Sequence, residues 1–252
     1  MLEICEPVVG MVYEQQIQKL KGHAVAFVDE LEWIIQSFAV AEPMIKNKAL
    51  LDKVIQHKST MGFRVLRRSV GRYCIIGLTR LTYDKGSKNP TARNLINDLT
   101  CLCTGADGLR KQLKVNFARP VRPGVVPGYP PTELDIKLSE EIDQLEVAEN
   151  QQLFEDYISR LEEHWKWFSE HESKFIEFRN KRVAHLEVTK YEDRYGPTEI
   201  EPVEWDLAVE ALGRLIQVAG YVSAILENAG SDWNQTLWFA KKDAQDFWQA
   251  HE

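Results

Sequence analysis

One stretch decides the fold class, residues 132–182, TELDIKLSEEIDQLEVAENQQLFEDYISRLEEHWKWFSEHESKFIEFRNKR. Its apolar side chains recur at steps of mostly three and four, the spacing of one face of an α-helix. The pattern predicts one very long helix. Because that helix is longer than typical globular helices, we expect a break near Asn150. The recurring residues are Leu138, Ile142, Leu145, Leu153, Tyr157, Leu161, Trp165, Phe168, Phe175 and Phe178.

The same helical spacing occurs through most of the remaining chain. A first amphipathic segment spans Tyr13 to Val40, and Pro43 is expected to end it or to bend it sharply. Thr91 follows Pro90 and precedes the next apolar face, so it is a candidate helix N-cap. Further helices are predicted over residues 45–56, 60–83, 91–117 in one or two pieces, 204–222 and 236–250.

The longest interruption of this pattern is residues 118–133, ARPVRPGVVPGYPPTE, which contain five of the ten prolines. Proline does not fit the interior of a regular helix or of a central strand, so an extended connection is expected. Strand signals are weak throughout. The sequence therefore predicts an all-α fold, an elongated bundle of about six to eight helices. We expect a single domain over residues 1–252, with helices in residues 1–117, the connection 118–133 and further helices in residues 134–252.

Composition bounds the class of protein. The chain has 252 residues, 44% hydrophobic residues and a net charge of -7, so it has material for a core and no overall attraction to nucleic acid. Its first ten residues do not resemble a signal peptide, and no uncharged run of about 18 residues occurs. We therefore expect a cytoplasmic protein without a membrane partner, and we expect no cofactor. The cysteines lack the paired spacing of a metal site or a redox motif, so we expect no metal and no disulfide. The four cysteines are Cys5, Cys74, Cys101 and Cys103.

Two segments carry opposite charge. Residues 61–93 have eight cationic side chains and one aspartate, a net charge of +7, whereas residues 133–178 have fourteen acidic and four basic residues, a net charge of -10. The two helices could pair through this complementarity. Alternatively, Arg64, Arg68 and Arg72, spaced at four along one helix face, could follow the phosphates of an RNA strand. Both interpretations stay open at the level of sequence.

The predicted long helix ends in a cationic sequence, RNKRVAH, residues 179–185. Cations are favourable near a helix C-terminus, where exposed carbonyl groups carry partial negative charge. A more specific interpretation is a phosphate site, with Arg179 as a bidentate donor, Asn180 as an amide donor and His185 as a proton donor or acceptor. Lys181 and Arg182 would add contacts to RNA.

Cleavage of RNA through the ribose 2'-hydroxyl requires a base, an acid and positive charge on the developing phosphorane. One chain supplies a single histidine in this motif. Two chains related by a two-fold axis would bring two sets of Arg179, Asn180 and His185 to one cleft. The sequence therefore suggests a homodimer.

The motif RNKRVAH near the end of a long helix resembles the arginine, polar residue and histidine signature of the HEPN superfamily. The longer phrase FIEFRNKRVAHLEV, residues 175–188, and the segment LTRLTYD, residues 78–84, most resemble its AbiU-like abortive-infection branch. The resemblance implies a homodimeric, metal-independent endoribonuclease in phage defence or a toxin–antitoxin pair, with RNA as substrate and a possible antitoxin partner. Arg179, Asn180 and His185 would match the family's catalytic positions.

One position departs from part of this superfamily. In HEPN toxins that a nucleotidyltransferase silences, a tyrosine two residues after the histidine accepts the nucleotides, whereas Glu187 stands there in this chain. Two other functions stay open, a noncatalytic RNA- or nucleotide-binding protein and a helical scaffold. A scaffold could dock through the aromatic residues of the C-terminal segment 233–252, which more often pack on their own core. His164 and His171 lie seven apart among acidic residues, a spacing that could bind a metal, but we expect them to be solvated because no cysteine or third histidine joins them.

Overall fold

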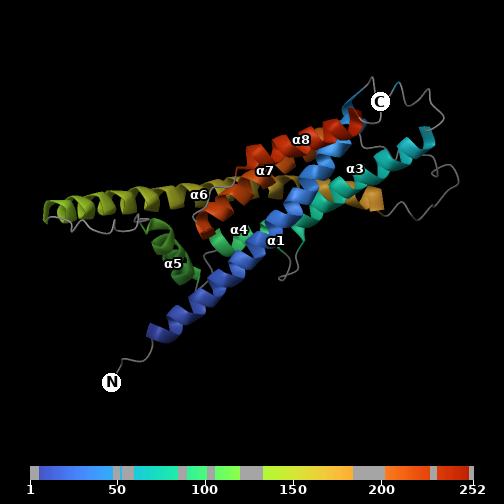
Figure 1. Cartoon of the computed structure of the whole chain (residues 1–252). Helices are drawn as coiled ribbons and strands as arrows, with labels where there is room; N and C mark the ends of the chain where they lie inside the picture. Colours follow the sequence, from blue (N-terminus) through green and yellow to red (C-terminus); the bar gives the residue numbers. More distant parts are fainter. Residues whose placement is uncertain are drawn as a thin grey trace.

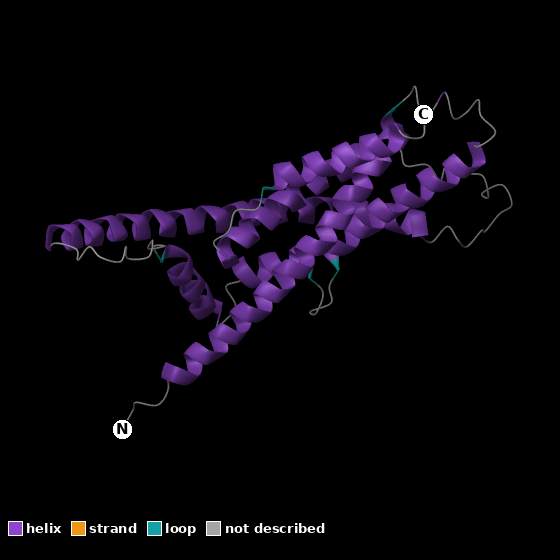
Figure 2. Cartoon of the chain, viewed as in Figure 1, coloured by secondary structure: helices purple, strands orange, loops and turns teal. Residues whose placement is uncertain are grey.

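The computed structural model describes residues 6–47, 52, 60–84, 90–100, 106–119, 133–183, 202–227 and 232–249. Within these residues the regular structure consists of helices, and no strand occurs (Figures 1 and 2). The all-α prediction is therefore confirmed. The helices are α1 (Glu6–Lys46), α3 (Thr60–Tyr83), α4 (Ala92–Thr100), α5 (Ala106–Ala118), α6 (Glu133–Val183), α7 (Pro202–Glu227) and α8 (Trp233–Gln249).

Helix α6 is the longest element and carries the motif at its C-terminal end. It runs through 51 residues without interruption, so the expected break near Asn150 is wrong. The segment contains neither glycine nor proline, and most of its residues have high helix propensity. Its contacts with α3, α4, α5 and α7 also support the helix, while its N-terminal end extends beyond the other helices (Figure 1).

The core lies around α7, which contacts both α1 and α6. Fully buried residues of α7 include Trp205, Leu215 and Val218, and they share one hydrophobic cluster with Phe27 of α1 and Phe154 of α6. The stretch Trp205–Glu227 is long and apolar enough to cross a membrane, but 56% of its apolar window is buried inside the structure. Packing in the bundle therefore accounts for the apolar character of α7.

Helix α1 continues past the proline that was expected to end it or bend it sharply. Pro43 lies inside α1, which ends at Lys46, six residues after the predicted Val40. The backbone amide of Asn47 donates to the carbonyl of Pro43 at 3.0 Å, which completes the last turn. Pro43 lacks an N–H, but buried Ala41 and Met44 on either side of it hold this turn against the core.

The predictions for α3, α4 and α5 are confirmed, whereas two other predicted segments lie largely outside the described residues. The helix predicted over residues 60–83 is found with the same bounds, and the segment 91–117 contains two helices, α4 and α5. Thr91 caps α4, because its Oγ accepts the backbone amide of Asn94 at 3.2 Å. The helix predicted over 45–56 and the proline-rich connection lie largely outside the described residues.

Helix α5 is fixed to α6 by a three-residue ion cluster. Arg110 and Lys114, one turn apart on α5, donate to the two carboxylate oxygens of Glu155 at 2.6 and 2.7 Å. The hydrogen bond from Lys114, and then that from Arg110, lower the pKa of Glu155 below its usual range. Because all three side chains are partly exposed, the cluster orients the helices more than it stabilises them.

A close approach between α1 and α5 depends on a glycine. A Cβ atom at Gly108 would overlap Tyr13 Oη and lie 2.5 Å from Tyr13 Cζ. We expect Gly108→Ala to destabilise the chain by about 1–3 kcal/mol, because Tyr13 or α5 must shift. The cost should largely disappear in a Tyr13→Ala background, measured as a double-mutant cycle by urea unfolding.

A matched control for this prediction is Gly22→Ala in α1, where a new Cβ meets nothing within 4 Å. That change should raise stability by roughly 0.5–1 kcal/mol through helix propensity alone. An equal effect of the two alanines would contradict the close approach of Tyr13 to α5.

Candidate functional site: the C-terminal end of α6

The C-terminal turns of α6 position the arginine and the asparagine of the motif. Phe175 is fully buried and its ring lies 6.0 Å from that of Phe178, which packs against the core. These two aromatic residues anchor the helix immediately before the motif. Arg179 is then partly buried and Asn180 is exposed. The last described turn of α6 thus presents polar groups on a helix held in place by its apolar side.

Arg179 differs from most described arginines in its partners. The side chains of five others form ion pairs with a glutamate, whereas Arg179 has no ion pair or hydrogen bond within the described regions of the chain. Its guanidinium is therefore available to an anion, and a guanidinium suits the geometry of a phosphate. The paired arginines are Arg80, Arg93, Arg110, Arg160 and Arg214.

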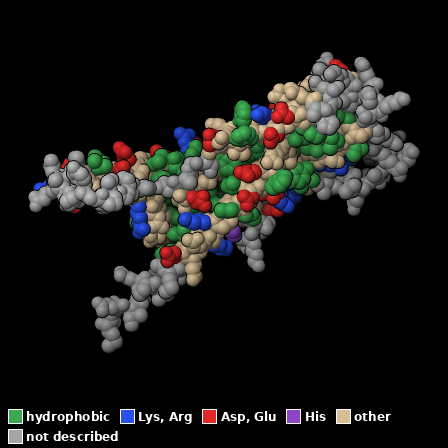
Figure 3. Space-filling view, viewed as in Figure 1, with side chains coloured by type: hydrophobic (Ala, Val, Ile, Leu, Met, Phe, Trp, Pro, Cys, Tyr) green, Lys and Arg blue, Asp and Glu red, His purple; other side chains and the backbone are tan. Residues whose placement is uncertain are grey.

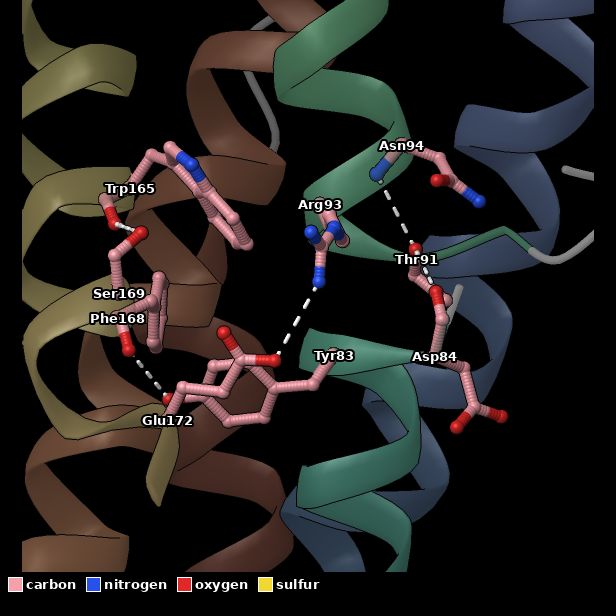
Figure 4. Close-up of polar contacts among 9 residues, drawn as sticks. All are labelled: Tyr83, Asp84, Thr91, Arg93, Asn94, Trp165, Phe168, Ser169 and Glu172. Atoms are coloured by element: carbon pink, nitrogen blue, oxygen red, sulfur yellow. Dashed lines mark hydrogen bonds and ion pairs between the residues drawn. The ribbon is translucent and has the colours of Figure 1, made fainter. Parts of the chain in front are cut away.

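A polar network supports α6 from the side of α3 and α4. Tyr83, the last residue of α3, donates its hydroxyl to the carbonyl of Phe168 at 2.9 Å, and its ring packs on Phe168 and Phe175. In Figure 4, Arg93 of α4 reaches between Trp165 and Glu172. Its guanidinium lies 5.6 Å from the Trp165 ring centroid and 3.5 Å from a Glu172 oxygen.

The protonation state of Tyr83 favours its hydrogen bond to α6. Burial, and then the negative charge of Glu172, raise the pKa of Tyr83 above its ordinary value. Tyr83 therefore stays protonated at neutral pH and donates its hydroxyl hydrogen to the Phe168 carbonyl of α6. These contacts support α6 one to three turns before Arg179.

The remaining motif residues are described less fully. Lys181 and Arg182 lie within α6, but their side chains, like the whole of His185, lie outside the described residues. The predicted orientation of His185 relative to Arg179 therefore remains a prediction. The structure brings together Arg179 and Asn180 at the end of one helix, and the sequence places His185 two residues beyond the end of α6.

A family model for AbiU2, of the HEPN type, matches residues 17–247, which include the motif and extend from α1 to α8. The chain belongs to the AbiU2 family. Membership confirms the resemblance drawn from the motif and indicates an HEPN-type role in abortive infection. No curated protein and no solved structure gives a significant match to the chain.

In this AbiU2-family chain, the basic row of α3 lies toward the same end of the molecule as the motif. Helix α3 packs on α6, and the N-terminal half of α3 points toward the C-terminal end of α6 (Figure 1). Arg68 is exposed and Arg72 is partly buried, while the Arg64 side chain lies outside the described residues. Aromatic packing at Tyr83 joins the two helices, and contact of the arginine row with RNA remains a prediction.

One face of this AbiU2-family protein has mixed charge. Figure 3 shows acidic, basic and apolar side chains interspersed on this face, and no broad basic area appears among the residues coloured there. A phosphate site on this face would therefore be local, in keeping with the net charge of -7. Among the described residues, no group of three or more His, Cys, Asp or Glu side chains could hold a metal ion.

The two histidines of α6 are not a solvated pair, contrary to the expectation from sequence. His164 is 7% exposed and stacks on Tyr221 of α7, and its Nδ1 has no hydrogen-bond partner among the described residues. His171 stacks on Trp167 with ring centroids 4.2 Å apart, and its Nδ1 lies 2.8 Å from the Trp167 carbonyl oxygen. Sequence periodicity placed both on an acidic helix but could not show which side α7 covers.

The sequence did not predict that a side chain of α7 would pack on the stacked rings of Trp167 and His171. Arg214 of α7 lies 4.5 Å above the Trp167 ring and pairs with Glu210. The spacing of Trp167 and His171 by four residues is a signal that the sequence contains, but the partner from α7 is brought there only by folding. This stack joins α6 to α7 beside the buried imidazole of His164.

The stability of the protein should decrease as the pH falls below about 6.5, the ordinary pKa of histidine. Burial, and then the nearby Arg214 cation, lower the pKa of His164 in the folded chain. In this pH window the unfolded state binds a proton that the folded state does not, so stability rises with pH. Urea unfolding at pH 5.5 and 7.5 should show a smaller difference for His164→Phe than for the parent. An equal difference would show that His164 is not the responsible group.

Proposed function

We propose that this AbiU2-family protein is a homodimeric, metal-independent endoribonuclease of the phage-defence or toxin–antitoxin type, acting in the cytoplasm. The observation that carries the proposal is the guanidinium of Arg179 at the end of α6, unpaired among the described residues, in a chain of HEPN type. RNA is the proposed substrate, and an antitoxin is a possible partner.

The position of Arg179 on an acidic helix supports this proposal for a physical reason. Such a helix offers many carboxylates within reach of its basic side chains, and Arg160 on the same helix is paired with Glu163 at 3.3 Å. An arginine left without such a partner keeps its charge and its donors for a bound anion. The adjacent exposed Asn180 adds an amide donor that a phosphate oxygen or a base can accept.

The proposed reaction uses the ribose 2'-hydroxyl of the substrate. A histidine, His185 of one chain, removes the 2'-proton, and the 2'-oxygen attacks the adjacent phosphorus. Arg179 stabilises the negative charge that develops on the non-bridging oxygens. A second His185 protonates the leaving 5'-oxygen as the phosphorus–oxygen bond breaks. The products would end in a 2',3'-cyclic phosphate and a 5'-hydroxyl.

The need for two histidines motivates the dimer. The motif contains one histidine per chain, and base and acid act on opposite sides of the phosphorus. A two-fold axis through the cleft would supply both roles from identical residues. Arg68, which is exposed in the N-terminal half of α3, is proposed as an additional contact with the RNA backbone, together with Arg64 and Arg72.

A cleavage assay in the presence of a chelator tests this function. We expect the purified protein to cut single-stranded RNA with excess EDTA, and the products to accept a 5'-phosphate from polynucleotide kinase without prior dephosphorylation. Light scattering should give the mass of a dimer. Replacement of the cleaved nucleotide by its 2'-deoxy analogue should abolish cutting at that position.

Two results would count against the proposal. Cleavage of the 2'-deoxy position at the normal rate would rule out attack by the 2'-hydroxyl. Binding of RNA without cleavage across a broad pool of sequences would instead favour a noncatalytic RNA-binding subunit, one of the functions that the sequence left open.

A further inference from the structure

The N-terminal ends of α3 and α6 carry opposite charge and do not meet within one chain. Residues 61–93 have a net charge of +7 and residues 133–178 a net charge of -10. Where α3 packs on α6, Tyr83 at the C-terminal end of α3 contacts Phe168 and Phe175. The arginine-rich N-terminal end of α3 and the acidic N-terminal end of α6 lie at opposite ends of the molecule (Figure 1). Helix packing within the chain therefore leaves these two charged ends apart.

The acidic surface is formed by Glu141, Ile142, Leu145 and Glu149 near the N-terminal end of α6. No described side chain of residues 137–150 is buried, and Leu145 is 65% exposed. Glu141 and Glu149 lie one turn to either side of Leu145, so charge and apolar area share one face of the helix. Neither glutamate has a hydrogen bond or ion pair within the described parts of the chain. The surface therefore has both charge and apolar area to offer to a partner.

Helix α5 shows how a basic helix contacts acidic residues of α6. Arg110 and Lys114 donate to Glu155, about two turns beyond the acidic surface. Phe117 of the same helix packs on Phe154 with ring centroids 5.8 Å apart. Ion pairs and apolar packing thus act together at this junction, and the acidic surface carries the same two kinds of group.

The basic surface is formed by Val65, Leu66 and Arg68 near the N-terminal end of α3. Val65 is 57% exposed and Leu66 is 42% exposed. Arg68 is exposed and has no hydrogen bond or ion pair within the described parts of the chain. Residues 60–73 contain four arginines and no acidic residue. This surface therefore has the opposite charge from the acidic surface, and it also exposes two apolar side chains.

A second copy of the chain is the occupant that these properties favour. Each copy carries both surfaces, whereas two acidic surfaces or two basic surfaces would repel one another. The net charge of -7 on each chain opposes association, but it is spread over the whole molecule, whereas the two surfaces bring opposite charges into direct contact. Exposed ion pairs contribute little affinity by themselves, so burial of the apolar side chains must supply most of it. The charges decide which surfaces meet, and their attraction weakens as salt is added.

We propose that the acidic surface of one chain binds the basic surface of a second copy. Because the two surfaces lie at opposite ends of one chain, the contact forms between chains and not within one (Figure 1). It involves neither Arg179 nor His185, so it is independent of the proposed ribonuclease activity and of pairing through the motif. The contact joins single chains, or the proposed dimers, into larger assemblies.

Light scattering and sedimentation of the full chain test the proposal at about 0.05 M and 0.5 M salt. At low salt the mean mass of the parent should rise with protein concentration, and high salt should reverse the rise. The double variant Glu141→Lys with Glu149→Lys makes both surfaces positive, so it should keep the lower mass. The double variant Arg64→Glu with Arg68→Glu makes both surfaces negative and should do the same. At high concentration the parent should reach about twice the mass of either variant.

A mixture of the two double variants makes the test specific, since each variant keeps the surface that the other has lost. An equimolar mixture should regain the heavier species at low salt. The matched control is Glu162→Lys with Glu170→Lys, which makes the same change in charge at exposed positions of α6 outside the acidic surface. This control should keep the mass of the parent. Circular dichroism checks that the helices remain formed in each variant.

Several results would overturn the proposal. Equal masses of the parent and both double variants at low salt would do so, as would a mixture that stays at the lower mass. Loss of the heavier species in the control would show a general effect of charge instead of a contact. If the parent keeps one mass but binds a synthetic helical peptide rich in lysine and leucine, the occupant of the acidic surface is a different protein.

The mass of the double variants tests the proposed function separately. A dimer mass supports pairing through the motif. A monomer mass counts against that pairing and leaves the contact between the acidic and basic surfaces unaffected.

Discussion

Replacement of Arg179 by alanine is expected to lower the rate of RNA cleavage by about 10²–10³, because a positioned donor to the developing negative charge is removed. Arg179 has no ion pair or hydrogen bond in the described regions of the chain, so the loss should not come from unfolding. The free energy of unfolding should change by no more than about 0.5 kcal/mol. The measurements are single-turnover cleavage of a defined RNA and urea unfolding of the same preparations.

Two variants make this test specific. Arg160→Ala removes an exposed arginine from the same helix, one paired with Glu163, and should leave cleavage unchanged. Arg179→Lys keeps the charge but loses the bidentate geometry, so it should restore only a fraction of the rate. His185→Ala should be at least as damaging as Arg179→Ala. Equal cleavage by the Arg179→Ala and Arg160→Ala variants would exclude Arg179 from the reaction.

Replacement of Phe168 by alanine should destabilise the protein by about 3–5 kcal/mol. Phe168 is fully buried, and its ring packs edge-on against both Tyr83 and Trp167. Truncation leaves a cavity where α3 meets α6. It also removes the aromatic ring that packs against Tyr83, whose hydroxyl is hydrogen-bonded to α6. The unfolding midpoint should fall by roughly 2–4 °C for each kcal/mol.

The matched control is Phe239→Ala in α8, where the same side chain is 48% exposed and stability should change little. Tyr83→Phe keeps the ring and removes only the hydrogen bond to the Phe168 carbonyl, so it should cost about 0.5–1.5 kcal/mol. If Phe168→Ala costs no more than Phe239→Ala, the junction of α3 and α6 does not belong to the cooperative core. Calorimetry or urea unfolding measures all three variants.

The helices were predictable where one face of the sequence is continuously apolar. The bounds of α3 were predicted from its sequence, and those of α6 to within one residue, because long periodic segments give the strongest signal. The predicted break near Asn150 does not occur, because the segment has no glycine or proline and its residues favour helix. Helix α1 also continues past Pro43, where an end or a sharp bend was predicted, and buried residues on either side of the proline hold this turn against the core.

The aromatic residues of the C-terminal segment divide into two groups that sequence could not separate. Trp233 is buried, and Trp248 donates its Nε1 to the Val40 carbonyl at 3.2 Å, so both belong to the bundle. Trp238, Phe239 and Phe247 remain between 44% and 56% exposed. Core packing therefore holds for Trp233 and Trp248, whereas docking to a partner stays a prediction for the three exposed residues.

The sequence predicts the residues of the candidate site but not their surroundings. The motif points to Arg179 and Asn180 because their order and spacing are local properties of the chain, and their role stays a prediction. That Arg179 has no carboxylate partner among the described residues could not be read from an acidic helix, because ion pairs depend on side-chain positions. The environment of His164 likewise depends on the ring of Tyr221 and the charge of Arg214, both 50 or more residues away in sequence.

By itself, the sequence determined the all-α class, the family resemblance and the order of the helices, since these follow from periodicity and short motifs within single segments. Only the tertiary structure decided which charges are paired, which histidine is buried and which charged surfaces stay exposed. Those properties arise between helices, from contacts of residues distant in the chain. The physical reason is that burial and pairing depend on neighbours in space, whereas helix formation depends mainly on neighbours in sequence.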